Sequence, residues 1–358
     1  MIMTVDYEFE LNNLVETLLK QNSSDMHFSV GHKPIMRTAG KLLTVDDCPV
    51  LTTEDVLGFA SVLLSEYRKT EFEEEWESDF SYQTANDNRF RGHIFYQNGN
   101  PGIVLRHIPN VVKDIDELNL PAILHSFAQM KQGFFLCVGP VGQGKSTTLA
   151  SLVEYINQNK FEHIVTVEDP VEYIYIPKKS IINQREVGVD TKSFETGLHA
   201  AFRQDVNVIL VGEMRSRETI ATAVTAAETG HLVLSTMHTN NAAQSINRII
   251  DSMPGETQDQ VRMQLAGSLV GIFSQRLVPT IDGSGRVPAF ELLVNNNAVA
   301  NLIREDRIHE INSVIETGLE HGMLDMNRSL VDLVKKGIIS VESAFTHSFN
   351  PKSLERLI

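Results

Sequence analysis

Residues of the types that hold phosphate groups stand together near the middle of the chain. The segment after the apolar run 133–138 has the spacing G-x-x-x-x-G-K-S. In this pattern glycines let backbone N–H groups converge on phosphate, a lysine reaches the β- and γ-phosphates, and the final hydroxyl can ligate Mg²⁺. We therefore predict binding of ATP and Mg²⁺. The predicted nucleotide-binding residues are Gly139, Pro140, Val141, Gly142, Gln143, Gly144, Lys145, Ser146 and Thr147.

A second apolar run, 206–211, ends in a glycine and Glu213. An apolar strand that ends in a carboxylate beside a P-loop has the Walker B arrangement, in which the acid holds Mg²⁺, partly through water. Ser146 and Glu213 are therefore the predicted metal-binding residues. The alternative is a strand-end glutamate that faces solvent.

A third apolar run, 164–167, is followed by three carboxylates within five residues, Glu168, Asp169 and Glu172. One of them is predicted to act as the base that orients or deprotonates a water molecule. Spacing alone does not decide which one. A solvated acidic loop is the alternative.

Two histidines, His231 and His238, bracket a fourth apolar run. Because they stand at opposite ends of one predicted strand, they cannot ligate the same ion. Each can be structural or catalytic on chemistry alone. A histidine at the carboxyl end, the place of His238, could sense the γ-phosphate and report hydrolysis.

A pair of arginines, Arg89 and Arg91, lies in a predicted strand whose alternation puts both on one face. Two guanidinium groups on one face suit phosphate recognition. Supplied to a neighbouring subunit, such an arginine finger can raise the rate about 10³–10⁵-fold. The alternative is that they pair with the acidic tract 71–77.

The elements that must position these residues are short apolar strands separated by helices, a pattern typical of a parallel sheet covered on both faces. In such a sheet, ligands bind beyond the carboxyl ends of the strands. We predict an α/β domain over residues 119–358, with a helical C-terminal segment from about 297 to 358. Residues 108–118 read as an interdomain linker. At 358 residues the chain is long enough for two domains.

Residues 1–107 are predicted to form a smaller α+β domain. Apolar residues at helical spacing indicate a helix over 9–19. The stretch 52–75 also reads as helical, with Thr53 as a candidate N-cap. Alternating apolar residues over 79–96, around a turn at 86–88, indicate a β-hairpin.

The bulk composition describes an ordinary globular chain, with 42% hydrophobic and 22% charged residues. No apolar stretch approaches the roughly 20 residues that cross a bilayer, and the N-terminus does not resemble a signal peptide, so a cytoplasmic protein is expected. The net charge of −15 argues against nucleic-acid binding over the whole molecule. Two distant cysteines, Cys48 and Cys137, exclude a four-cysteine zinc site.

Taken together, these motifs resemble the secretion-superfamily ATPases related to GspE, and specifically the PilT and PilU retraction ATPases of type IV pili. The resemblance covers nearly the whole chain. It rests on segments 24–28, 89–91, 166–172 (similar to the family's Asp box), 183–187, 209–215 and 226–231 (the His box).

The resemblance implies a PAS-like N-terminal domain joined to a RecA-like ATPase core, assembled as a homo-hexamer. It implies Glu172 as the catalytic glutamate, Glu213 as the Walker B carboxylate, His231 and His238 as the His-box pair, and Arg89 and Arg91 as arginine fingers. It further implies a location at the inner face of the cytoplasmic membrane, reached through an inner-membrane platform protein. A paralogous pilus ATPase is another implied partner.

Retraction is favoured over assembly because assembly and type II secretion relatives usually carry a four-cysteine zinc element and an added N-terminal domain. Retraction enzymes typically carry A-I-R-N-L-I-R-E near the C-terminus, whereas residues 298–305 read A-V-A-N-L-I-R-E. Residues 203–205 read R-Q-D where the family often has R-E-D. Together with S-R-E-T at residues 216–219, these features slightly favour PilU-like paralogues. The alternatives are an accessory or nucleotide-gated scaffold ATPase, a pilus assembly or type II secretion ATPase, and, from the fold alone, an ATPase acting on DNA.

Overall fold

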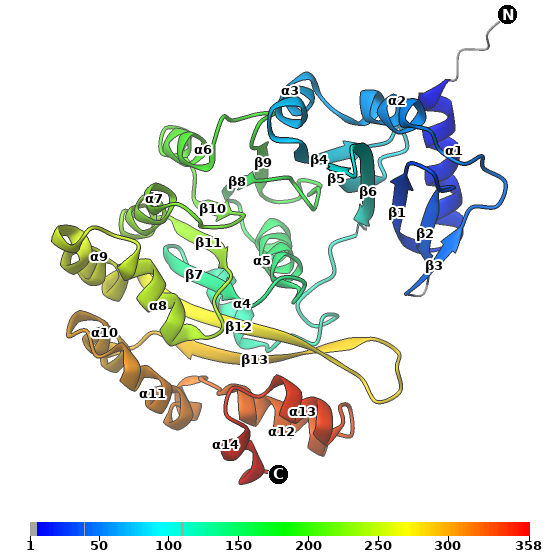
Figure 1. The fold of residues 1–358 in the computed structure, drawn as a ribbon. Coiled ribbons are helices and arrows are strands. Elements are labelled where there is room, and N and C mark those ends of the chain that lie inside the picture. The colour runs from blue at the N-terminus through cyan, green and yellow to red at the C-terminus, as the bar shows by residue number, and fades with distance from the viewer. Residues whose placement is uncertain (1–5, 39, 109–110) are drawn as a thin grey trace, which may run out of the picture. The chain divides into compact units, whose positions relative to one another are not determined.

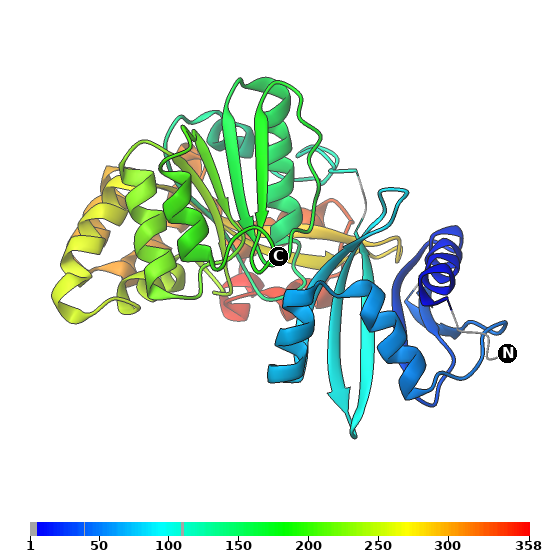
Figure 2. The same cartoon turned by 90° about the horizontal axis from the view of Figure 1, so that it is seen from above.

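The computed structural model describes residues 6–38, 40–108 and 111–358 (Figures 1 and 2). The chain divides into two compact units. The first contains residues 1–111 together with 169–174 and 186–192, and the second contains 112–168, 175–185 and 193–358. Within the expected linker, residues 109–110 lie outside the described residues, and 111–118 contain neither helix nor strand.

The first unit is built on a six-stranded antiparallel sheet in the order β3-β2-β1-β6-β5-β4. The predicted hairpin is confirmed as β4 and β5, which pair over their full length. The strands are β1 (Ser23–Ser29), β2 (Ile35–Thr38), β3 (Lys41–Thr44), β4 (Glu77–Gln83), β5 (Arg89–Gln97) and β6 (Asn100–Ile108).

Three helices accompany this sheet: α1 (Tyr7–Lys20), α2 (Thr53–Leu63) and α3 (Glu66–Glu75). The predicted helical stretch 52–75 is confirmed as α2 and α3, interrupted at Leu64 and Ser65, but the expectation of Thr53 as the N-cap is wrong. Thr52 caps α2 in a reciprocal capping box with Asp55, and the chain becomes extended at Leu64. Ser65 then caps α3 by accepting a bond from the Arg68 amide. Side-chain oxygens at these positions satisfy amides that a helix start leaves without partners, so they define two helices instead of one.

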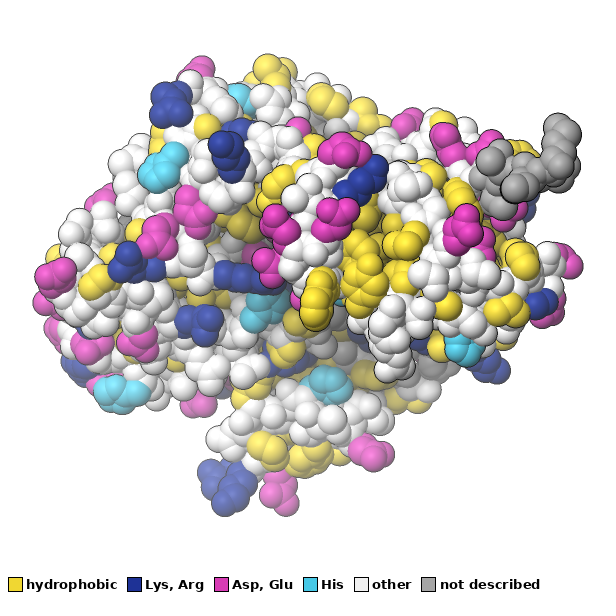
Figure 3. Space-filling view, turned by 45° about the horizontal axis from the view of Figure 1, so that its top comes forward, with side chains coloured by type: hydrophobic (Ala, Val, Ile, Leu, Met, Phe, Trp, Pro, Cys, Tyr) yellow, Lys and Arg dark blue, Asp and Glu magenta, His cyan; other side chains and the backbone are white. Residues whose placement is uncertain are grey.

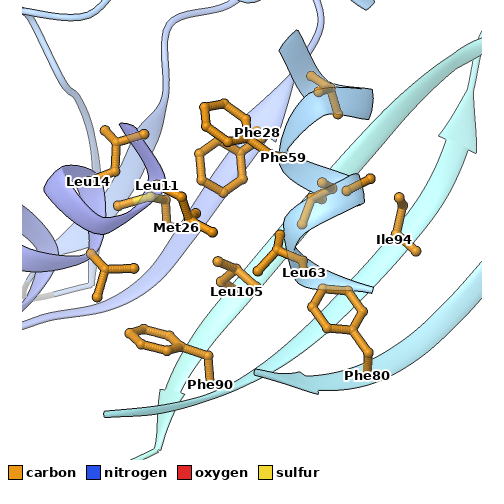
Figure 4. Close-up of a cluster of buried hydrophobic side chains, with 14 of the residues drawn as sticks. Leu11, Leu14, Met26, Phe28, Phe59, Leu63, Phe80, Phe90, Ile94 and Leu105 are labelled. Atoms are coloured by element: carbon orange, nitrogen blue, oxygen red, sulfur yellow. The ribbon is translucent and has the colours of Figure 1, made fainter. Parts of the chain in front are cut away.

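The core of the first unit lies between the sheet and helices α1 and α2. Figure 4 shows side chains from α1, α2, β1, β4, β5 and β6 converging on it. Alternate residues of β5, such as Phe90 and Ile94, point into this core, which leaves Arg89 and Arg91 on the other face. The buried face therefore explains why both arginines face the same way.

The second unit contains a seven-stranded sheet in the order β13-β12-β7-β11-β10-β8-β9. Five neighbouring strands, from β12 to β8, run parallel, and β13 is antiparallel to β12. The predicted parallel sheet is thus confirmed. The strands are β7 (Gly133–Val138), β8 (His163–Glu168), β9 (Ile181–Glu186), β10 (Val208–Val211), β11 (Leu232–Met237), β12 (Leu269–Pro279) and β13 (Arg286–Val294).

Helices cover both faces of this sheet. Both α5 and α7 contact β7 and β11, and Figure 2 shows α5 on one side of these strands and α7 on the other. Every residue of β7, β10 and β11 is buried, as burial of two faces requires. The helices are α4 (Ile123–Gln129), α5 (Lys145–Asn159), α6 (Phe194–Ala201), α7 (Arg217–Glu228), α8 (Ala242–Asp251) and α9 (Gly255–Ser268).

The C-terminal segment is helical, as predicted. Its α-helices are α10 (Asn297–Arg304), α11 (Ile311–Thr317), α12 (Met326–Lys335), α13 (Val341–His347) and α14 (Pro351–Glu355). Leu330, Ile339 and Leu354 form a separate small core with Val278 of β12 and Ala289 of β13. The tail is therefore anchored on the two strands at one edge of the sheet. Within the described part of the chain, no helix combines the length and the apolar character that a bilayer crossing requires.

Candidate nucleotide site

The predicted phosphate loop joins the end of β7 to the start of α5, at the carboxyl edge of the parallel sheet. Gly139, Gly142 and Gly144 have positive φ angles of 147°, 75° and 78°. A Cβ on Gly139 would lie 2.6 Å from the carbonyl oxygen of Gln275, and one on Gly144 would lie 2.9 Å from the amide nitrogen of that side chain. Side chains at these two positions would therefore both strain the backbone and collide with β12.

The start of α5 suits an anion. Gly144 is its N-cap residue and supplies no side-chain acceptor to the first turn. The amides of that turn can therefore donate to phosphate oxygens, aided by the positive end of the helix dipole. This glycine cradle fits the phosphates of ATP.

Lys145 is buried, and its ammonium group lies over the loop. Nζ donates to the carbonyl oxygens of Gly139 at 2.8 Å and Pro140 at 2.9 Å. It also lies 3.4 Å from Nδ1 of His238. Carbonyl groups of the loop thus place a positive charge where the β- and γ-phosphates of a nucleotide would be bound.

Glu213 follows β10, at the same edge of the sheet. Its carboxylate lies 3.4 Å from Nε2 of His238 and 2.7 Å from Nε of Arg215. Ser146, the second residue of α5, is exposed. Hydroxyl and carboxylate oxygens are ligands that Mg²⁺ accepts, and this ion commonly takes its remaining ligands from water and substrate phosphates. The donor set thus fits Mg²⁺ bound together with ATP.

The two histidines of β11 lie at opposite ends of the strand. His238 bridges Lys145 and Glu213, and both burial and the nearby ammonium of Lys145 hold its pKa below the usual value. A neutral imidazole at this point can exchange hydrogen bonds with a phosphate without opposing the lysine. His231 instead lies where the strand begins, with Nδ1 3.0 Å from the carbonyl oxygen of Ala226. The structure brings His238, and not His231, to the phosphate loop.

The arginine pair belongs to the first unit, and so does the segment 169–174 with Glu172. Arg91 donates to Glu172 at 2.8 Å and lies 3.8 Å from Asp79. Arg89 donates to the carbonyl oxygen of Val171 and to Glu186, both at 3.0 Å. The expected alternative, pairing with the acidic tract 71–77, is wrong for these contacts, since the partners come from 169–174, 186–192 and Asp79 of β4.

The three carboxylates after β8 have different surroundings. Glu168 is buried and accepts a hydrogen bond from Thr166 at 2.6 Å. Asp169 accepts one from the buried Arg68 at 2.9 Å. Glu172 is 23% exposed, less than Asp169 at 33%, but its partner Arg91 is 40% exposed whereas the Arg68 that holds Asp169 is 5% exposed. Of the three, Glu172 has the surroundings best suited to exchanging its partner for water.

Sequence reasoning missed two sets of residues in these networks. Arg68 donates hydrogen bonds to Asp169, Glu71 and the carbonyl oxygen of Val187. It lies in a helix with many charged residues and belongs to no recognisable sequence motif. Gln275 contacts the phosphate loop from β12, 132 residues away along the chain. Three consecutive polar residues within the otherwise apolar run of β12, Ser274 to Arg276, were the signal that could have drawn attention to it.

Comparisons with known proteins agree with this geometry. Residues 96–315 match the model of the type II/IV secretion system protein family. The type IV pilus retraction ATPase PilT of Pseudomonas aeruginosa is 41% identical over 335 residues, which cover 94% of this chain and 97% of that protein. The type IV pilus ATPase PilU of the same organism is 39% identical over 352 residues, covering 98% and 91%.

A solved structure of the pilus retraction motor PilT with bound ADP superimposes with a TM-score of 0.88 at 45% identity, covering 96% of this chain and 98% of that one. The predicted fold class, a RecA-like ATPase core with a smaller α+β domain before it and a helical tail after it, is thereby confirmed. The chain therefore belongs to the type II/IV secretion system protein family, and within it to the ATPases related to the pilus retraction motor PilT.

Proposed function

We propose that this protein is a hexameric motor that couples hydrolysis of ATP to retraction of type IV pili. The observation that carries this proposal is the junction of Lys145, His238 and Glu213 at the phosphate loop, in a chain 41% identical to a pilus retraction ATPase. The motor acts from the inner face of the cytoplasmic membrane on an inner-membrane platform protein. A paralogous pilus ATPase can work beside it.

In this mechanism the phosphate loop binds the nucleotide and Lys145 compensates the charge of its β- and γ-phosphates. Mg²⁺, when bound by Ser146 and through water by Glu213, would neutralise negative charge that develops on the phosphates. His238 exchanges its contact with Lys145 for one that depends on the γ-phosphate. His231, the other histidine that the His-box resemblance implies, is also a proposed catalytic residue. It lies at the opposite end of β11 from the phosphate loop.

Glu172 is the proposed base that orients the attacking water, for which it must leave Arg91. Arg91 then becomes available to stabilise charge on the nucleotide of an adjacent subunit, and Arg89 can do the same when it exchanges its contact with Glu186. Binding closes one first unit onto its neighbour and hydrolysis releases it. Closure in sequence around the ring moves the platform protein and withdraws pilin subunits.

The face drawn in Figure 3 and the overall charge do not favour action on DNA. On the face drawn in Figure 3, Lys and Arg side chains are spread among acidic and hydrophobic ones. The chain carries 46 acidic against 31 basic residues. Nucleic-acid binding needs basic side chains gathered along the phosphate path.

The proposal is tested by deleting the gene in the source organism, counting surface pili and measuring twitching. More pili with loss of motility is the expected result. Loss of pili would assign the protein to assembly, and unchanged pili and motility would assign it to an accessory role. Complementation with Lys145→Ala should fail because the phosphate charge is no longer compensated, whereas Lys131→Ala, an exposed lysine at the opposite end of β7, should restore retraction.

A further inference from the structure

Strand β12 runs beside the phosphate loop and extends past the end of β7. Ser274 pairs with Val138, the last residue of β7, so the next two residues of β12 lie alongside the loop. These residues, Gln275 and Arg276, are both buried. Buried polar side chains in an apolar strand carry a desolvation cost unless they are hydrogen-bonded, so their partners indicate why they are there.

Gln275 connects the two ends of the phosphate-binding segment. Its amide nitrogen donates to the carbonyl oxygen of Gln143 at 2.8 Å, and its amide oxygen accepts from Oγ1 of Thr148 at 2.7 Å. In return, the side-chain oxygen of Gln143 accepts from the backbone amide of Leu277 at 2.7 Å. One side chain of β12 thus holds both the loop before Gly144 and the first turns of α5.

Ser274 and Arg276 lie on the opposite face of β12 and hold a different loop. Oγ of Ser274 donates to the carbonyl oxygen of Asn240 at 2.7 Å. Nη2 of Arg276 donates to Oδ1 of Asn240 at 3.0 Å and lies 3.4 Å from its carbonyl oxygen. The guanidinium group also stacks on the Phe349 ring, 5.0 Å from its centroid. Asn240 stands two residues after His238, so these bonds restrain the segment that carries the histidine to Lys145.

We propose that Gln275 and Arg276 are positioning residues for ATP hydrolysis. Gln275 sets the shape of the phosphate loop, while Arg276, assisted by Ser274, sets the position of the loop that carries His238. Alternation along a strand lets adjacent residues restrain two different loops from one rigid support. The proposal rests on the proposed function, because it takes His238 to respond to the bound phosphate.

The two residues are expected to separate nucleotide affinity from turnover. Gln275→Leu removes both bonds to the loop and should weaken binding of a fluorescent ADP analogue about tenfold, because a loosened loop no longer presents its amides together. Arg276→Met keeps an unbranched side chain against Phe349 but loses Asn240. It should leave ADP affinity within about twofold and lower kcat about tenfold, because hydrolysis, but not ADP binding, requires His238 in its correct position.

Matched variants exclude a general loss of structure. Arg248→Met, on the exposed face of α8, should change neither quantity. Arg276→Lys retains a cationic donor and should recover part of kcat. Gln275→Leu combined with Thr148→Val removes the hydroxyl that the first change leaves without its acceptor. If this double variant regains stability but not ADP affinity, the lower affinity results from a changed shape of the phosphate loop and not from the unpaired hydroxyl of Thr148.

The outcomes are distinguishable. Wild-type protein that neither binds ADP nor hydrolyses ATP would overturn the proposed function itself. Active wild-type protein with unchanged KM, kcat and ADP affinity in both variants would overturn the positioning roles alone. Parallel loss of kcat and ADP affinity in Arg276→Met, with a lowered Tm that Arg276→Lys does not restore, would show that Arg276 only stabilises the fold.

Discussion

The cationic groups proposed to contact phosphate, together with Arg68, are held in different ways in the two units. In the first unit, Arg68, Arg89 and Arg91 each contact a carboxylate of segment 169–174 or 186–192. In the second unit, carbonyl oxygens position the ammonium group of Lys145. A phosphate approaching the lysine displaces neutral groups, whereas a phosphate approaching the arginines must replace a carboxylate. In the proposed mechanism, the second unit is therefore preformed for nucleotide, and the first must exchange ion pairs before its arginines can contact a phosphate.

The strongest test of this comparison is a substitution of Glu172, the proposed base. Glu172→Gln should lower kcat by about 10²–10⁴-fold with ADP affinity little changed, because the amide cannot accept the proton of the attacking water. Purified protein assayed for phosphate release gives the first quantity, and titration with a fluorescent ADP analogue gives the second.

Asp169→Asn is the matched variant in the same segment. Its carboxylate contacts the buried Arg68 but is 33% exposed, so this variant should lower the free energy of unfolding by about 1–2 kcal/mol and affect kcat less. Full ATPase activity in Glu172→Gln would remove the base assignment. A larger fall in kcat for Asp169→Asn would transfer that role to Asp169.

Arg91 and Arg68 provide the second test of this comparison, because the exposed fractions of their side chains differ. The Arg91 side chain is 40% exposed, whereas that of Arg68 is 5% exposed. Arg91→Ala should cost at most about 1 kcal/mol of stability, as exposed ion pairs do, yet reduce ATPase activity strongly. Arg68→Ala should cost about 3 kcal/mol by leaving buried polar groups without their partner. Urea unfolding and phosphate release measure the two effects.

Mixing tests the action of Arg91 in trans. Arg91→Ala subunits keep Lys145, and Lys145→Ala subunits keep Arg91, so some interfaces of a mixed ring are complete. Partial recovery of hydrolysis is expected. Absence of recovery at every mixing ratio, with mixed rings demonstrated by mass spectrometry, would place the role of Arg91 within its own chain.

The smallest effect concerns Glu291 of β13, a buried carboxylate in the second unit that accepts from the backbone amide of Ala242 at 2.9 Å. Burial raises its pKa from 4.5 to about 7. The folded protein therefore binds a proton that the unfolded chain releases between these pH values. This contribution to stability is complete below pH 4.5 and is lost as pH rises through about 7, by up to about 3 kcal/mol.

Glu291→Gln keeps an acceptor for Ala242 and has no charge to bury. Its free energy of unfolding relative to the wild type should be similar near pH 5 and higher near pH 8. Unfolding by urea across this pH range provides the measurement. A difference that does not change with pH would show that Glu291 is already ionised in the folded protein at low pH.

The extent of prediction from sequence follows from how far apart the interacting residues lie along the chain. The phosphate loop was recognised because its chemistry lies within eight consecutive residues after an apolar strand, and strand ends then brought Glu213 and His238 beside it. The contact of Arg68 with Asp169 spans 101 residues and that of Gln275 with Thr148 spans 127. Such pairs depend on the tertiary arrangement of elements, which periodicity does not specify.

Local signals also had limits. The apolar and charged pattern over 52–75 is compatible with one helix, and the break at Leu64 depends on a single cap at Ser65. In contrast, the unbroken apolar runs of β7, β10 and β11 admitted few alternatives because burial on two faces excludes polar residues.

The assignment of residues 169–174 and 186–192 to the first unit has a practical consequence for dividing the protein. A fragment beginning near residue 112 would retain Asp169, Glu172 and Glu186 but lose the arginines that neutralise them. Negatively charged side chains would then repel one another on an acidic chain. The loops that carry them would also lose the side chains that hold them in place. Fragments that begin near residue 112 therefore do not represent the whole protein, because arginines before that residue neutralise segments 169–174 and 186–192 of the same chain.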